Sequence, residues 1–372
     1  MKSPGDQKVT WVELFFDLVF VFAVTQVVVL LEHDLSGRTI VQAILIFWLI
    51  WWSWTQFTWT LNLMDTTHSF VQFITLVTTA VAFLMATTIP RAFGGRALWF
   101  AIPYVLTRVI GLSLQIKIAD TQKQKDAVRI WLFGSLGGLT SVVVGGFVGG
   151  DLQYVFWILT IILDFIAAIL GARGGGWELY PEHFSERHGL IMIIALGESL
   201  IVAAGGLVNE EFNLRVIGIG MLALAMICAL WWSYFVKTQP ILEHAMGITP
   251  AVERGKLARD AFSLFHFPML AGIISYTLAV DSAIAHPTSN QLTDEARMAL
   301  AVGLLLFIGG TALAVLRASG EIMIGRIVLI LILSFVIFVG IIPIHELWLG
   351  FIGVLTIVIF EQVSPPRLGS AD

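Results

Sequence analysis

The sequence has few charged residues for its length. Lys, Arg, Asp and Glu make up 13% of the 372 residues, whereas soluble globular domains carry about 25%. Hydrophobic residues make up 58%, and the mean hydropathy is +0.89. A chain with so little charge cannot cover a water-exposed surface, which excludes a soluble globular protein.

Cysteine is almost absent. The single residue, Cys228, excludes an intramolecular disulfide and a metal site built on cysteines. A Walker A motif, a dinucleotide fingerprint, a zinc motif and a serine-nucleophile motif are also missing from suitable contexts. We therefore expect no cofactor, no metal and no nucleic-acid partner.

Long apolar runs dominate what is present. Runs of about 20 residues are typical of transmembrane helices, and the short alternating segments of a β-barrel do not occur. The sequence thus predicts an all-α polytopic membrane protein in contact with membrane lipids. Twelve candidate spans lie near residues 11–31, 39–61, 66–89, 96–117, 129–149, 152–172, 186–206, 213–237, 259–281, 297–317, 323–341 and 345–361.

The positions of Lys and Arg predict the orientation. Most of them lie in the two tails and in the loops after even-numbered spans, such as the loop with Lys117, Lys123 and Lys125. Cytoplasmic loops carry this excess of positive charge. We therefore expect a multi-pass protein of the bacterial inner membrane with both termini in the cytoplasm.

A glycine-rich segment, GARGGGWELYPEH, divides the chain. It predicts two similarly oriented six-helix halves, 1–172 and 186–372, joined by a cytoplasmic linker at 173–185. A weak internal repeat supports this division. The tetrapeptide WWSW at 51–54 returns as WWSY at 231–234, and Asp17 falls near Glu198 at almost the same offset.

The first apolar run, TWVELFFDLVFVFAVTQVVVLL at 10–31, contains two carboxylates, Glu13 and Asp17. Each charge in hydrocarbon costs about 2.5–3.5 kcal/mol on insertion scales. Four residues separate them, so they share one helix face. That face should point into the protein or towards water. Glu13 also fits a capping box with Thr10, so a functional role and a capping role both stay open for this residue.

Other ionisable residues lie at similar depths in other spans. At 1.5 Å per residue, they lie about 9–18 Å from the cytoplasmic ends of their spans. Buried charges are usually paired, and we expect Arg108 to pair first with Asp17 and next with Asp164. A structural clamp would also explain Arg108, and a buried hydrogen-bonding group would explain Asp164. The candidate site residues are Asp17, Glu198, Arg108, Glu13, His266, Asp164, Glu186 and Arg187.

Two of these candidates have more than one interpretation. His266, in LFHFPMLAGII, could be a hydrogen-bonded core histidine or a proton carrier. Glu186 and Arg187 could form a helix-end charge pattern. Arg187 also shares a helix face with Glu198, and that face could line a cytoplasmic vestibule.

Three blocks, VTWVELFFDLVFVFAVTQ, HFSERHGLIMIIALGESLI and FHFPMLAGII, resemble the bacterial low-temperature-requirement A (LtrA) membrane protein family. The likeness extends over nearly the whole chain and implies a bacterial inner-membrane protein, associated by name with growth in the cold. It implies no settled activity. A looser likeness is to cation channels with an F-S-D motif in the first of six helices, but Phe16-Asp17 lacks the serine.

The sequence alone favours a transporter or channel for a small solute or ion. It could be proton-coupled, with its site at the interface of the first and seventh spans. One alternative is an intramembrane lipid-modifying enzyme that uses His266 with Asp17 or Glu198. Another is a structural or sensory membrane protein.

Overall fold

The computed structural model is all-helical over the residues it describes, namely 3, 7–173, 177–209 and 213–363. Within these ranges, ten helical segments are long and apolar enough to cross a membrane. Their outward faces are apolar, as in α5, where 72% of Phe133 and 78% of Phe147 is exposed. Such faces suit hydrocarbon and not water. The protein is therefore a polytopic helical membrane protein.

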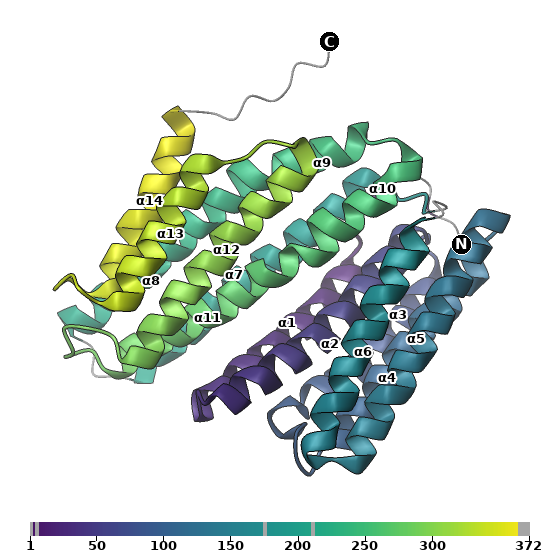
Figure 1. The fold of residues 1–372 in the computed structure, drawn as a ribbon, viewed down its shortest axis with the longest axis horizontal. Helices are drawn as coiled ribbons and strands as arrows, with labels where there is room; N and C mark the ends of the chain where they lie inside the picture. Colours follow the sequence, from purple (N-terminus) through teal and green to yellow (C-terminus); the bar gives the residue numbers. More distant parts are fainter. Residues whose placement is uncertain (1–2, 4–6, 174–176, 210–212, 364–372) are drawn as a thin grey trace. The chain divides into compact units, whose positions relative to one another are not determined.

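The helices group into two compact units (Figure 1). Unit 1 comprises Met1–Ile191 and Met246–Arg259, and unit 2 comprises Met192–Ala245 and Asp260–Asp372. Unit 1 contains α1 (Trp11–His33), α2 (Gly37–Asn62), α3 (Ser69–Ala86), the short η1 (Ile89–Arg91), α4 (Ala97–Ile118), α5 (Gln122–Val148), α6 (Gly150–Arg173), the start of α7 (Pro181–Asn209) and α10 (Ala251–Leu257).

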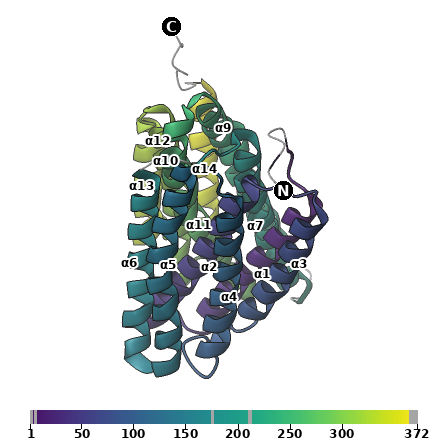
Figure 2. The same cartoon turned by 90° about the vertical axis from the view of Figure 1, so that its right-hand side faces the viewer.

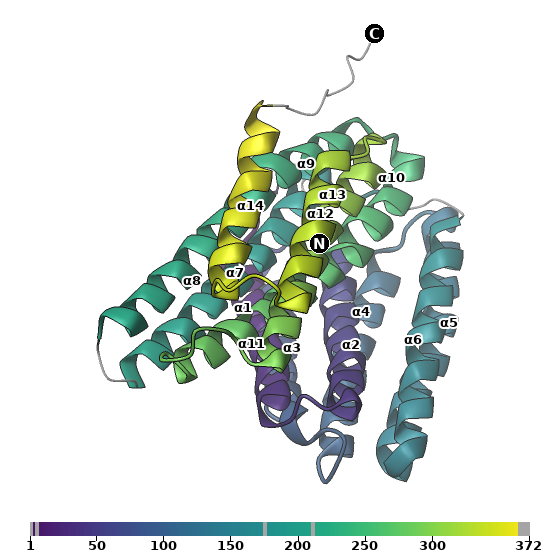
Figure 3. The same ribbon diagram turned by 60° about the vertical axis from the view of Figure 1, so that its left-hand side comes forward.

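Unit 2 begins within α7 and contains the remaining helices. Figure 3 shows α14 beside α8, two helices that pack on each other. The unit comprises the rest of α7, α8 (Leu214–Trp232), η2 (Ser233–Thr238), most of α9 (Gln239–Ile248), most of η3 (Ala258–Leu264), α11 (His266–Ala285), α12 (Asp294–Ser319), α13 (Ile324–Val339) and α14 (Glu346–Val363).

Helix α2 lies at the centre of unit 1, where it packs on α1, α4 and α6. Its polar side chains are buried together with its tryptophans, so both faces of the helix meet protein.

Outside the spans, the loop before α2 is ordered by Asp34. The Ser36 and Thr39 hydroxyls donate to its carboxylate and lower its pKa.

The glycines of α5 form a close helix contact with α6. Helices α5 and α6 lie side by side (Figure 2). A Cβ on Gly134 would lie 2.4 Å from the Cβ of Ala167, and one on Gly145 would lie 2.8 Å from the Trp157 ring. Only glycine permits this spacing, which is the usual way that membrane helices approach closely.

Two π-helical turns, η2 and η3, interrupt long helical segments of unit 2. Such turns leave the regular α-helical hydrogen-bond pattern and are frequent at functional sites. A side chain of η2 contacts the start of α11. The Tyr234 hydroxyl of η2 lies 2.7 Å from Nε2 of His266, the residue that begins α11.

Several sequence predictions about the fold stay predictions. The count of twelve spans is one of them, because α13 has only 16 residues. The halves at 1–172 and 186–372 and the internal repeat are the others. In both tetrapeptides of the repeat the last two side chains are buried, Ser53 with Trp54 and Ser233 with Tyr234. The preceding tryptophans differ, because 51–52 are buried whereas 231–232 are exposed.

Candidate functional site

A fully buried charge cluster joins α1 to the start of α7 within unit 1. Arg187 Nη1 donates to Oε1 of Glu13 at 2.7 Å, and Arg187 Nη2 donates to Oδ1 of Asp17. The relative exposure of all three side chains is 0%. The sequence grouped these residues as candidates without predicting this arrangement. We call Glu13, Asp17 and Arg187 the acid–arginine cluster.

The helix geometry of α1 explains why both acids reach one guanidinium. Their four-residue spacing places them one turn apart on one face. Between them on the buried side lies Phe16, whose ring packs against Phe20 and Phe57. An apolar wall therefore excludes water from this side of the cluster.

Glu13 has two structural roles at once. Its Oε2 accepts hydrogen bonds from the Thr10 backbone N–H at 3.0 Å and from the Thr10 hydroxyl at 2.9 Å. Its Oε1 accepts from Arg187. The predicted capping role is therefore confirmed, and it leaves one carboxylate oxygen for the arginine.

His183 extends the cluster towards Asn62. Asn62 Oδ1 accepts from the Tyr180 backbone N–H at 2.9 Å, and Asn62 Nδ2 donates to the Tyr180 carbonyl at 3.0 Å. The second Nδ2 hydrogen therefore points to His183 Nδ1, 3.2 Å away. His183 Nε2 lies 3.3 Å from Glu13 Oε2 and 3.4 Å from Gln7 Nε2.

Asp17 is only half satisfied by protein groups. Its Oδ1 accepts from Trp54 Nε1 at 2.7 Å and from Arg187. Its Oδ2 is buried and has no hydrogen-bond partner in the described part of the chain. A buried carboxylate oxygen without a partner is costly, unless it binds a proton, a cation or water.

The cluster is unbalanced in charge. Two carboxylates share one guanidinium, and among the described residues no other Lys or Arg forms an ion pair with either of them. One further positive charge would complete the balance, and Asp17 Oδ2 is the open position for it.

Two other candidates on α7 lie outside this cluster. Glu186 is exposed, and its Oε2 accepts from the Val9 backbone N–H at 3.2 Å. Glu198 is half-buried and belongs to unit 2. The functional role predicted for Glu198 stays a prediction.

The predicted preference of Arg108 for Asp17 is wrong. Arg108 forms a bidentate ion pair with Asp164, at 2.9 Å to Oδ1 and 3.0 Å to Oδ2, and it also contacts Tyr104 and Ser135. Similar depth along two helices does not say that the helices are neighbours. The pair is balanced and fully buried, which fits a clamp between α4, α5 and α6.

His266 has partners on both ring nitrogens within unit 2. Nε2 accepts from the Tyr234 hydroxyl, and Nδ1 donates to the Ala261 carbonyl at 3.1 Å. The relative exposure of His266 is 0%, and its ring stacks on Phe262. These contacts agree with a hydrogen-bonded core histidine.

Sequence reasoning missed a third buried ion pair. Arg326 of α13 donates to both oxygens of Glu361 of α14, with 2.7 Å between Nη2 and Oε2. Its Nη1 also donates to Thr311 at 2.7 Å and to Thr238 at 3.2 Å. Arg326 and Glu361 each lie near a helix end that the sequence predicts on the cytoplasmic side. This shared position is the sequence feature from which the pair could have been predicted.

No group of His, Cys, Asp or Glu side chains within the described residues could hold a metal ion.

Comparison with known proteins places the sequence among bacterial membrane proteins. Residues 8–360 match the family model described as "Bacterial low temperature requirement A protein (LtrA)". A curated relative, Uncharacterized protein RA0937 of Rhizobium meliloti (strain 1021), is 28% identical over 326 residues, which cover 83% of this chain and 78% of the relative. No solved structure matches the chain.

Proposed function

We propose that this chain, which belongs to the bacterial low temperature requirement A (LtrA) family, is a transporter or channel for a small solute or ion. We propose that a proton or small cation exchanges at Asp17 during its cycle. The family match and the apolar helices establish an integral membrane protein. Transport is our inference from the acid–arginine cluster.

The charge imbalance of this cluster carries the proposal. An ion pair that serves only stability needs equal charges, as in the Arg108–Asp164 and Arg326–Glu361 pairs. The acid–arginine cluster has one more acid than it has cations. Ionisable groups of this kind inside membrane spans commonly mark ion paths and proton relays.

The surroundings favour Asp17 over its neighbours as the exchanging group. Glu13 is occupied by Thr10, Arg187 and His183. Asp17 Oδ2 has no such partner among the described residues. Binding of a proton there leaves Glu13 and Arg187 as a neutral pair, whereas its release restores the excess negative charge.

Glu198 is the second carboxylate in the proposal. It lies in the middle of the long apolar helix α7 and is half-buried, which suits a group that meets water during part of a transport cycle. We also propose an inner-membrane location with both termini in the cytoplasm. This orientation follows from the distribution of Lys and Arg.

Flux through liposomes that contain the purified protein tests the proposal. A pH gradient with a potassium diffusion potential is imposed, and an internal pH dye reports proton movement, with sodium and potassium tested separately. Asp17→Asn keeps the shape of the side chain and the acceptor for Trp54, but it cannot exchange a proton. We expect this variant to fold with an unchanged melting temperature and to lose the coupled flux.

The matched control is Asp151→Asn, the same substitution at a carboxylate that is 97% exposed and pairs with Arg38. It should leave flux unchanged. If wild-type liposomes carry no proton or cation flux, or if Asp17→Asn keeps full flux, the proposal is wrong. Glu198→Gln tests the second carboxylate independently.

A further inference from the structure

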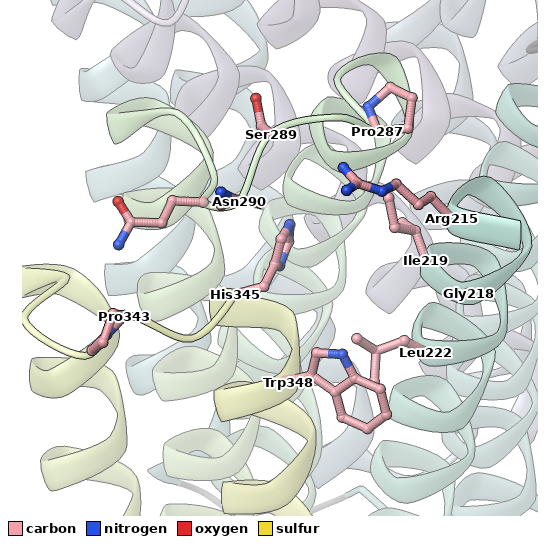
Figure 4. A pocket seen from close by; sticks show the side chains of 11 residues that line it. Arg215, Gly218, Ile219, Leu222, Pro287, Ser289, Asn290, Pro343, His345 and Trp348 are labelled. Atoms are coloured by element: carbon pink, nitrogen blue, oxygen red, sulfur yellow. The ribbon is translucent and has the colours of Figure 1, made fainter.

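A large pocket opens between the start of α8 and two loops of unit 2 (Figure 4). Its volume is about 920 Å³, near the upper end of the range for small-molecule sites. It lies at the start of α8, in the loop between α11 and α12, and in the loop between α13 and α14. All of its lining residues belong to unit 2, so it is separate from the acid–arginine cluster of unit 1.

The pocket combines hydrogen-bond donors with an apolar floor. Figure 4 shows the Arg215 guanidinium and the His345 ring at one end, with Trp348 and Leu222 at the other. Ser289, Asn290 and Gln291 complete the polar part of the lining. A ligand with a polar head and an apolar body fits this division.

Arg215 is largely available to a ligand. It is exposed, and its Nη1 donates to the Thr288 carbonyl at 3.3 Å. In the described parts of the chain no carboxylate forms an ion pair with it. The backbone contact positions the guanidinium and leaves its other N–H groups for an acceptor.

His345 provides a second donor. Its Nδ1 accepts from the Leu347 backbone N–H at 3.3 Å, so the proton of the neutral ring is on Nε2. The adjacent Glu346 does not line the pocket. It is fully buried, and its Oε2 accepts from the Leu292 backbone N–H at 2.9 Å. The lining of the pocket therefore includes an arginine and no carboxylate.

We propose that this pocket binds a small organic oxyanion, a carboxylate or phosphate ester, with Arg215 and His345 at the oxyanion and the apolar part of the ligand against Trp348 and Leu222. The same chemistry could come from a free solute or from a phospholipid headgroup. The proposal does not depend on transport through Asp17, and it holds whether or not that proposal fails.

Calorimetric titration of the full-length protein with phenyl phosphate tests the pocket. The protein is held in nanodiscs of phosphatidylcholine. Phenyl phosphate carries both a phosphate and a ring, and benzyl alcohol, which has the ring without the charge, serves as the ligand control. We expect phenyl phosphate to bind and benzyl alcohol not to bind.

Arg215→Gln should weaken phenyl phosphate binding about tenfold or more, because a charge-assisted hydrogen bond is lost. His345→Phe should weaken binding less, since it removes a neutral donor. The matched control is Arg96→Gln. Arg96 is also exposed and also donates from Nη1 to a backbone carbonyl, that of Thr87 at 3.2 Å, but it lies outside the pocket. Its substitution should leave binding unchanged.

A second set of nanodiscs distinguishes the two sources of oxyanion. If phosphatidylglycerol in the bilayer weakens phenyl phosphate binding to the wild type, the natural occupant is a lipid headgroup. If binding is unaffected, the occupant is a free solute. Absence of phenyl phosphate binding, or equal binding by Arg215→Gln and the wild type, would overturn the proposal.

Discussion

Removal of the Arg187 guanidinium is the most direct perturbation of the acid–arginine cluster. Arg187→Gln leaves Glu13 and Asp17 fully buried, one helix turn apart, without their shared cation. Breaking a buried ion pair by removal of one partner costs about 3–5 kcal/mol. The two acids would also repel each other, so we expect a loss of unfolding free energy towards the upper end of this range.

Asp17→Asn should partly rescue this loss. The amide removes one of the two unpaired charges, so the double variant should be more stable than the sum of the single effects predicts. Interaction energies between residues in one charge network are about 0.5–3 kcal/mol. By itself, Asp17→Asn should change stability little, because Glu13 and Arg187 remain as a balanced pair.

Reversible unfolding in mixed micelles with increasing dodecyl sulfate, followed by far-ultraviolet circular dichroism, measures this double-mutant cycle. Arg38→Gln is the control, because Arg38 also pairs with an acid but at an exposed position, and it should leave the midpoint unchanged. Strict additivity of Arg187→Gln and Asp17→Asn would refute the reasoning. Unchanged stability of Arg187→Gln would refute it as well.

Two further predictions concern helix packing in unit 1. Arg108→Met should cost about 3–5 kcal/mol of unfolding free energy. In the same micelle assay, the effect of Arg108→Met on the unfolding free energy should couple strongly to that of Asp164→Asn and be additive with that of Asp17→Asn. Strong coupling to Asp17→Asn with additivity to Asp164→Asn would contradict the ion pair with Asp164. Gly134→Ala should cost about 1–3 kcal/mol, because its Cβ would lie 2.4 Å from that of Ala167. Gly309→Ala, where a Cβ meets nothing within 4 Å, should be neutral or slightly stabilising, and equal effects at the two positions would count against the close contact.

The local chemistry of the site was predictable from sequence, but its pairings were not. The acids at 13 and 17 stand out because charge is rare in apolar runs, and Thr10 with Glu13 matches a capping box. The choice of Arg108 as the partner failed because two residues at equal depth can belong to helices that do not touch. His183 and Trp54 were missed as site residues, since only the packing of α2 and α7 brings them to the acids.

The sequence by itself determined that this protein is built of apolar helices and belongs in a membrane. Those properties depend on composition and on residues close together in the chain, such as the apolar runs and the glycines of α5. Only the tertiary structure decided that Arg187 lies between Glu13 and Asp17, that Arg108 pairs with Asp164, and that the start of α8 and two loops of unit 2 form one pocket. Each of these arrangements joins segments that are distant in sequence, and their proximity depends on how the helices pack.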